Sequence, residues 1–276
     1  IILLVIESTE KIVLNLESVY DLFTSIDKLG EVDDFNLDDQ TTQKDILPVD
    51  NKKPMDVELK NISFSYPQTN KKILNDINFH FQSGKKYVIT GNNGSGKSTL
   101  LHLISGLYKP TAGNISINGH SFQCYKYDDL NSIAGNGLKE ETLFEGTLME
   151  NITLGRKDIS TNDVELVLEK LFLKEYVTSI PKGLFTPVEP LGRKLPRSII
   201  QKILLARALV NNPRLLSIEY NLDAIEISER MKIQSFLFDK KNDWTLIMIS
   251  NDEQVIKEAD VVIKMNNGTF ESVSTQ

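Results

Sequence analysis

The feature that most constrains this chain is a glycine-rich octapeptide, GNNGSGKS, which runs from Gly91 to Ser98. It fits the pattern G-x-x-x-x-G-K-[ST] without a mismatch. The apolar run KKYVIT before it predicts a strand, and KSTLLHLISGLY after it predicts a helix. Glycines let successive backbone N–H groups point at phosphate oxygens, and the start of a helix adds its positive dipole end. We therefore expect a site for a nucleoside phosphate.

Within this loop, each residue type has a physical role. Lys97 supplies a positive point charge to the terminal phosphates, and the hydroxyl of Ser98 is a ligand for Mg²⁺. The expected phosphate-binding residues are Gly91, Asn92, Asn93, Gly94, Ser95, Gly96, Lys97, Ser98 and Thr99. A GTPase would also need a base-reading Asn-Lys-x-Asp late in the chain. The similar NKKP at 51–54 lies upstream and lacks the Asp, so we interpret it as linker.

Composition excludes several other classes of protein. The net charge of −7 over 276 residues argues against a broad basic surface, so we expect no nucleic-acid partner. The single cysteine, Cys124, allows no intrachain disulfide and fits a reducing compartment. No apolar run approaches the roughly 18 residues that would cross a bilayer.

The pattern of strands and helices predicts an α/β fold. VELKNISFSYP and LNDINFHF alternate like strands, and RLLSI (214–218) and TLIMI (245–249) are buried-type strands. Helical periodicity dominates from about 131 to 210, most clearly in VELVLEKLFLKEYV and IIQKILLARALV. The closing segment DVVIKMNNGTF predicts a hairpin with an Asn-Gly turn. We expect a mainly parallel sheet, an antiparallel β layer and a helical subdomain at about 131–210.

The first 54 residues differ from the rest. Residues 1–30 have apolar side chains at helical spacing and end at Gly30, which predicts an amphipathic helix. Residues 31–54 are acidic and polar, which is typical of a linker, so the domain is expected at 55–276. The helix either packs on its own domain or ends a segment that continues upstream. Because the chain opens with Ile rather than Met, we expect it to be part of a longer polypeptide.

Five further segments carry a resemblance to a known family. They are FSYP (64–67), GLYKPTAGNISINGH (106–120), LFEGTLMENITLG (143–155), ARALVNNPRLL (206–216) and the closing ADVVIKMNNGTF. In this order and spacing, residues 56–272 resemble the ATP-binding domain of ABC transporters of the exporter type. The resemblance implies a P-loop NTPase fold that binds ATP with Mg²⁺ at the cytoplasmic face of the cell membrane.

The same resemblance implies partners and an adenine contact. One partner would be a transmembrane domain of the exporter, with residues 1–30 as the end of its last helix. The other would be a second ABC ATP-binding domain, identical or different. In the family an aromatic residue ahead of the phosphate loop stacks on adenine, and Tyr66 holds that position; it could also be an ordinary strand tyrosine.

The chain departs from the family in the signature segment, LSGGQ, with which each domain closes on its partner's ATP. The matching residues here are Leu195, Pro196, Arg197, Ser198 and Ile199. Glycines permit close backbone approach to the terminal phosphate, so side chains at Arg197 and Ser198 crowd it. Pro196 also removes a backbone donor. Arg197 and Ser198 could still donate hydrogen bonds to phosphate.

Three catalytic positions depart as well. The family has Asp-Glu after the strand RLLSI, where this chain has Glu219 and Tyr220. Glu219 can still hold Mg²⁺, but Tyr220, with a phenol pKa of about 10, is a poor base for the attacking water. The switch histidine is replaced by Asn251, which carries no proton or charge. Lys139 holds the place of the glutamine that contacts Mg²⁺; it would be repelled by the metal unless it partly replaces it as a counter-charge to phosphate.

Three functions follow from these observations. The first is the ATP-binding domain of an ABC exporter with slow or partner-dependent hydrolysis. The alternative is a pseudo-ATPase that binds ATP as a switch without appreciable hydrolysis. A soluble, non-transport ABC protein is disfavoured by the acidic charge and the single domain. Asp223 or Glu226 could take the role of the missing base, or these acids could face the partner domain.

Overall fold

The smaller of the two main β-sheets is antiparallel and has the order β2-β1-β4-β5. The computed structural model describes residues 53–67, 69, 71–139, 141–219 and 222–276, without the side chains of 127 and 128. The four strands are β1 (Val57–Ser65), β2 (Lys72–Phe81), β4 (Ala112–Ile117) and β5 (His120–Ser121). Side chains of β1 such as Val57 and Leu59 are buried, while Lys60 and Asn61 are exposed. This sheet confirms the expected antiparallel layer.

The larger sheet is mainly parallel and has the order β12-β11-β3-β10-β9-β6. Its strands are β3 (Lys86–Gly91), β6 (Ala134–Gly137), β9 (Leu215–Ile218), β10 (Thr245–Ile249), β11 (Val261–Asn266) and β12 (Thr269–Thr275). Only β12 runs antiparallel to its neighbour, β11, through the expected hairpin. Two short strands, β7 (Gly146–Thr147) and β8 (Pro187–Val188), pair separately. The predicted α/β fold is thus confirmed.

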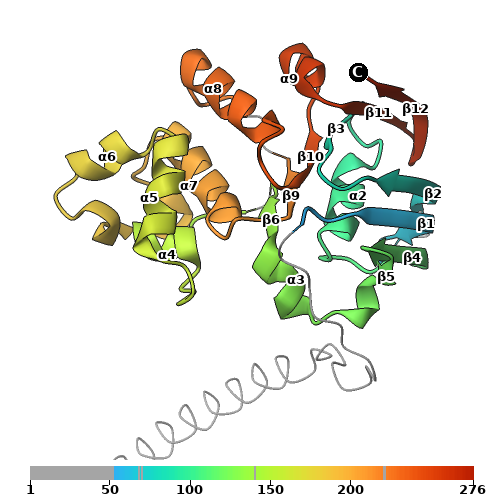
Figure 1. Cartoon of the computed structure of the whole chain (residues 1–276), viewed down its shortest axis with the longest axis horizontal. Helices are drawn as coiled ribbons and strands as arrows, with labels where there is room; N and C mark the ends of the chain where they lie inside the picture. Colours follow the sequence, from blue (N-terminus) through green and yellow to red (C-terminus); the bar gives the residue numbers. More distant parts are fainter. Residues whose placement is uncertain (1–52, 68, 70, 140, 220–221) are drawn as a thin grey trace, which may run out of the picture. The chain divides into compact units, whose positions relative to one another are not determined.

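Helices surround the larger sheet and also form a group to one side of it. They are α2 (Lys97–Ile104), α3 (Tyr127–Ile133), α4 (Leu148–Thr153), α5 (Thr161–Lys170), α6 (Lys174–Ser179), α7 (Arg197–Leu209), α8 (Ile227–Phe238) and α9 (Glu253–Glu258). Figure 1 shows α4 to α7 gathered beside the sheets, as a helical subdomain. Capping boxes begin α4 at Thr147 and α5 at Ser160, so each helix start satisfies its own N–H groups.

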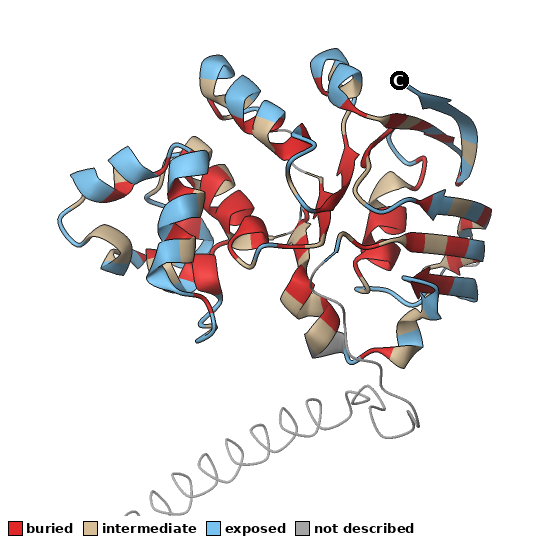
Figure 2. Ribbon diagram, viewed as in Figure 1, coloured by how far each residue is buried: buried red, intermediate tan, exposed pale blue. Residues whose placement is uncertain are grey.

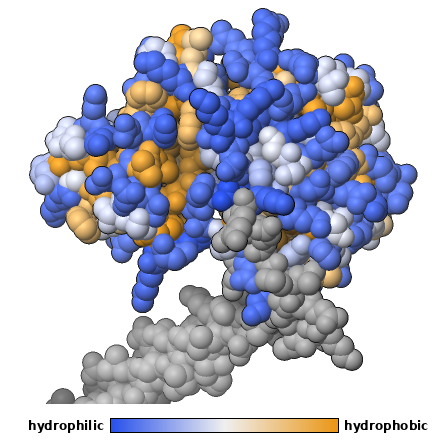
Figure 3. Space-filling model, viewed as in Figure 1, coloured by the Kyte–Doolittle hydropathy of each residue, from blue (hydrophilic) through white to orange (hydrophobic). Residues whose placement is uncertain are grey.

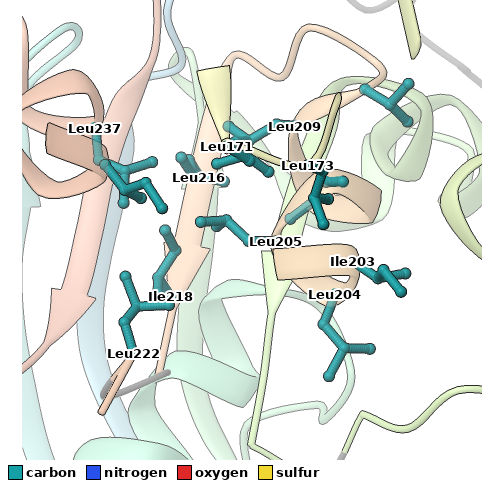
Figure 4. Close-up of a cluster of buried hydrophobic side chains, with 14 of the residues drawn as sticks. Leu171, Leu173, Ile203, Leu204, Leu205, Leu209, Leu216, Ile218, Leu222 and Leu237 are labelled. Carbon is teal, nitrogen blue, oxygen red and sulfur yellow. The ribbon is translucent and has the colours of Figure 1, made fainter. Parts of the chain in front are cut away.

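The central strands are buried on both faces, and Figure 2 shows them in the buried colour. Alternate residues of a strand point to opposite faces, so β9 serves two hydrophobic clusters. Leu216 belongs to the cluster shared with the helical subdomain, while Leu215 belongs to the cluster of α2 and the antiparallel sheet. Figure 4 shows Leu205 and Leu209 of α7 against Leu216. The sheet therefore holds the two halves of the domain together.

The helix expected in VELVLEKLFLKEYV is broken into two. Residues 171–173 separate α5 from α6, because Phe172 takes a left-handed backbone with φ of 55°. The break lets Leu171 and Leu173, at 0% and 1% exposure, both enter the core, which a straight helix would place on different sides. The predicted single helix was wrong at this point.

The expected helical region at about 131–210 begins too early. Residues 134–137 form β6, the outermost strand of the parallel sheet, so the helical subdomain starts after it. The expected helix at 1–30 lies outside the described residues, as does the linker up to residue 52. Within the described part of the chain, none of the helices has the length and apolar character needed to cross a bilayer.

Candidate nucleotide site

Four neighbouring parallel strands bring the candidate residues to one edge of the larger sheet. The phosphate loop (residues 91–98) follows β3, Asn251 follows β10, Glu219 follows β9, and Lys139 lies two residues beyond β6. The carboxyl ends of parallel strands are where open α/β sheets bind ligands. The topology therefore assembles, from distant parts of the sequence, a site that only the phosphate loop marks by itself.

The phosphate loop needs glycine both for its left-handed backbone conformation and because a side chain would not fit. Gly91, Gly94 and Gly96 all have positive φ, from 79° to 141°. A Cβ on Gly91 would lie 2.3 Å from the carbonyl oxygen of Met265, and one on Gly96 would lie 2.8 Å from Leu74 Cδ2. An L side chain would therefore displace the loop from the strands beneath it.

The hairpin turn between β11 and β12 supports the phosphate loop from one side. The N–H of Gly268 donates to the carbonyl of Ser95 at 3.0 Å, and the carbonyl of Gly268 accepts from Asn75 N–H at 3.0 Å. A Cβ on Gly268 would lie 2.2 Å from the carbonyl oxygen of Ile73. Gly268 thus positions the loop, a role that sequence analysis missed, although its Asn-Gly turn was visible there.

Lys97 lies folded over the phosphate loop. Its Nζ donates to the carbonyls of Gly91 at 2.9 Å and Asn92 at 2.8 Å, and to Ser95 Oγ at 3.3 Å. Partial burial lowers the pKa of Lys97 from its ordinary value, while the negative charge of Glu219 opposes this shift. The ammonium group is therefore held where the loop's phosphate ligand belongs.

Ser98 and Glu219 form a pair of oxygen ligands. Ser98 Oγ donates to Glu219 Oε1 at 2.5 Å. The second carboxylate oxygen, Glu219 Oε2, is buried and has no hydrogen-bond partner among the described residues. Mg²⁺ prefers hard oxygen ligands and is bound by one or two protein groups together with substrate phosphates. These two residues fit a Mg²⁺ ion carried with the nucleotide.

Asn251 is bound to the end of β3. Its Oδ1 accepts from Thr90 Oγ1 at 2.7 Å and from Gly91 N–H at 3.1 Å, and its Nδ2 lies 3.4 Å from the Gly91 carbonyl. The amide therefore fixes the start of the phosphate loop. It can reach a phosphate only as a neutral hydrogen-bonding group, because an amide does not titrate near neutral pH.

Tyr66 lies beside the helix that follows the phosphate loop. Its hydroxyl is 3.1 Å from Thr99 Oγ1, and its ring meets Phe64 and Tyr108 edge to face, at centroid distances of 5.1 and 5.7 Å. The half-buried ring is thus held at the border of the site by three neighbours. This position agrees with a base-stacking role.

A cavity of about 880 Å³ joins most of the predicted site residues; we call it the phosphate cavity. Its predicted members are Tyr66, Asn93, Gly94, Gly96, Lys97, Ser98, Thr99, Lys139, Arg197, Glu219 and Asn251. The phosphate-loop residues Gly91, Asn92 and Ser95 do not line it, and neither do Leu195, Pro196, Ser198 and Ile199 of the signature segment. Tyr220 lies outside the described residues.

The signature segment forms the start of α7. The carbonyl of Pro196 accepts from the N–H groups of Ile199 and Ile200, at 2.9 and 3.0 Å, and Ile199 is buried. Only Arg197 of this segment lies on the wall of the phosphate cavity. The segment therefore presents a guanidinium group where the family has a bare glycine backbone.

The two acids considered as substitute bases both accept hydrogen bonds from neighbouring residues. Asp223 lines the cavity and accepts from Gln201 Nε2 at 2.9 Å, and this bond, with help from the charge of Arg197, lowers the pKa of Asp223. Glu226 caps α8 and accepts from the Ser228 hydroxyl and from Ser228 N–H, the latter at 3.2 Å, and these two bonds lower the pKa of Glu226. A lowered pKa makes a carboxylate a weaker base.

Comparison with known proteins agrees with this geometry. The ABC transporter family model matches residues 74–218. The putative multidrug export ATP-binding/permease protein YgaD of Bacillus subtilis (strain 168) is 30% identical over 219 residues, covering 79% of this chain and 38% of its own. The ATP-dependent lipid A-core flippase of Pseudomonas savastanoi pv. phaseolicola is 32% identical over 215 residues, covering 77% and 36%. The chain thus spans less than two-fifths of the length of these relatives.

A solved structure extends the likeness of fold. It is a bacterial Atm1-family ABC exporter with ATP bound, which superposes with a TM-score of 0.82 at 24% sequence identity. The match covers 92% of this chain and 44% of that one. At this identity the likeness concerns the fold alone.

Proposed function

This chain belongs to the ABC transporter family, and we propose that it carries the ATP-binding domain of an exporter, in which ATP binding and slow or partner-dependent hydrolysis are coupled to transport across a membrane. The observation that carries the proposal is the complete phosphate loop, which opens on the phosphate cavity beside Glu219 and Tyr66. The names of two relatives, a putative multidrug export protein and a lipid A-core flippase, support an exporter.

Binding of ATP follows from the residues of the phosphate loop. Lys97 exchanges its bonds to the carbonyls of Gly91 and Asn92 for bonds to phosphate oxygens. The first N–H groups of α2 have no partner within the helix and face the same ligand. Ser98 and Glu219 would hold Mg²⁺, which would supply positive charge to the phosphates. Tyr66 stacks on the base.

Hydrolysis is expected to be slow. Phosphoryl transfer depends mostly on positioning and charge neutralisation, which Lys97 and the phosphate loop supply. A positioned general base typically contributes about 10²–10⁴-fold, and Tyr220 is a poor base at neutral pH. The carboxylates of Asp223 and Glu226 already accept hydrogen bonds within the chain, which supports this expectation. A pseudo-ATPase that uses ATP only as a switch is the alternative.

The proposal requires two partners. One is a second ABC ATP-binding domain, and the other is a membrane-spanning domain on the same polypeptide or another. Large apolar side chains are exposed on the helical subdomain and on the loops that lead to it, among them Phe144, Leu154 and Phe185, the last 72% exposed. Such exposed apolar residues support a protein–protein contact at this subdomain. On the face in Figure 3, hydrophobic residues gather over this subdomain, at the left. We place the domain at the cytoplasmic face of a membrane.

Titration with a fluorescent ATP analogue in the presence of Mg²⁺ tests the proposal. We expect saturable binding, and a loss of at least about tenfold in affinity for Lys97→Ala, because a charge-assisted bond to phosphate is removed. Lys174→Ala, at an exposed lysine of α6 away from the cavity, is the matched control. Absence of binding, or equal binding by Lys97→Ala, would disprove the proposal. Phosphate release well above background would exclude the pseudo-ATPase.

A further inference from the structure

A second lysine, Lys139, shares the phosphate cavity with Lys97. It is held there by the sheet, since the N–H of Glu219 donates to the carbonyl of Gly137 at 2.8 Å and so ties the end of β6 to the end of β9. The next residue, Leu138, is buried. Its carbonyl accepts from Glu141 N–H at 3.2 Å, which closes a turn after β6. The exposed Lys139 therefore lies at the carboxyl edge of the sheet and lines the same cavity as Glu219.

The carboxylates near Lys139 have other partners. Glu141 forms a salt bridge with Arg207 at 3.8 Å and accepts from Leu138 N–H at 3.4 Å. Glu219 accepts from Ser98. Among the residues that the structure describes, Lys139 has no salt bridge or hydrogen bond. Its charge is therefore available to a ligand in the cavity.

The cavity thus offers a triphosphate two ammonium groups, of which neither forms a salt bridge among the described residues. Lysine binds phosphate as a point charge and needs no fixed geometry, so an exposed side chain at the cavity wall is sufficient. Bulk water weakens such an interaction, whereas a cavity lined partly by Leu204 and Ile249 weakens it less.

We propose that Lys139 is a phosphate-binding residue that, together with Lys97, neutralises part of the nucleotide charge, so that ATP binding depends only weakly on Mg²⁺. This inference rests on the proposed function. It assigns to a second lysine part of the positive charge that Mg²⁺ otherwise supplies in addition to Lys97.

The test is titration of the fluorescent ATP analogue at constant ionic strength, once with Mg²⁺ and once with EDTA. We expect wild type to keep its affinity in EDTA to within about tenfold. Lys139→Gln should lose about tenfold more affinity in EDTA than with Mg²⁺, and Lys139→Arg should retain the wild-type pattern because it keeps the charge. Lys174→Gln makes the same change of charge away from the cavity and should behave as wild type.

The outcomes separate this inference from the proposed function. If wild type binds with Mg²⁺ but loses binding in EDTA as fully as Lys139→Gln does, the inference is overturned and the proposed function stands. The same holds if Lys139→Gln loses equal affinity in both conditions. If wild type does not bind even with Mg²⁺, both are overturned. Circular dichroism of each variant separates loss of binding from loss of folding.

Discussion

Asn251 and Tyr220 are the two residues that we propose to limit turnover. The Asn251 amide accepts from Thr90 and Gly91 and thereby fixes the end of β3. An imidazole at this position could carry a proton near neutral pH, which an amide cannot. Sequence alone could place Asn251 just after β10, but it could not identify partners that lie 160 and 161 residues away.

Restoring both positions should raise the rate of ATP hydrolysis. For Tyr220→Glu we expect an increase of about 10²–10⁴-fold, because a carboxylate can polarise the attacking water. Asn251→His should add to this increase when the two changes are combined. Phosphate release measures the rate, and adding Lys97→Ala to the double variant should abolish it. If no single or double variant turns over faster, the roles assigned to these two positions are wrong.

Among the elements, the β11–β12 hairpin matters for the site although it contributes no side chain to the cavity. Its turn residues, Asn267 and Gly268, both have positive φ, which is typical of a two-residue Asn-Gly turn. The same sequence, Asn118-Gly119, joins β4 to β5 with the same signs of φ. Of these two turns, only Asn267-Gly268 contacts the phosphate loop, so Asn118-Gly119 serves as an internal control.

Gly268→Ala should destabilise the fold and weaken ATP binding together. A left-handed residue with a Cβ lowers the free energy of unfolding by about 1–2 kcal/mol. Gly119→Ala should lose only this amount, since nothing lies within 4 Å of the new Cβ. At Gly268 the new Cβ would meet the Ile73 carbonyl at 2.2 Å, so we expect about twice that loss. Urea unfolding and analogue titration measure the two effects. Equal losses for both variants would contradict the role of the close contact.

Local sequence predicted some elements well and others poorly. The apolar runs of β9 and β10 and the Asn-Gly hairpin were evident because burial and turn chemistry are local signals. β6 was missed, since its sequence AGNG has no apolar alternation. Its glycine is required by packing from elsewhere: a Cβ on Gly135 would lie 2.1 Å from the carbonyl of Ala208 in α7. No signal within the strand itself reveals that contact.

At the scale of the whole molecule, eight consecutive residues were enough to predict the phosphate loop. They were not enough to predict which other residues line the cavity. Strand order β3-β10-β9-β6 decides that Lys139 and Glu219 join the loop, and strand order is a property of the complete sheet. The family resemblance supplied these positions in advance. The hydrogen bonds of Asn251 and Asp223, to partners 160 and 22 residues away, depended on the folded chain.

One buried charge links the sheet to the stability of the whole domain. Lys86, 1% exposed at the start of β3, donates to the carbonyls of Trp244 at 2.6 Å and Asn242 at 3.2 Å. Burial lowers the pKa of Lys86 from 10.5 to about 8. Burial acts in the opposite direction on its neighbour and raises the pKa of Tyr87 from 10.0 to about 12.

The stability of wild type relative to Lys86→Met should therefore rise with pH. Between pH 8 and 10.5 the unfolded chain still holds a proton on Lys86 that the folded chain has released, so the free energy of unfolding increases through this window. The full increase is on the order of 3 kcal/mol. Lys86→Met lacks this proton, while Tyr87 is present in both proteins, so its opposite effect above about pH 10 cancels in the difference. Urea unfolding of both proteins at several pH values measures the difference, and a value that stays constant with pH would mean that Lys86 keeps its ordinary pKa in the fold.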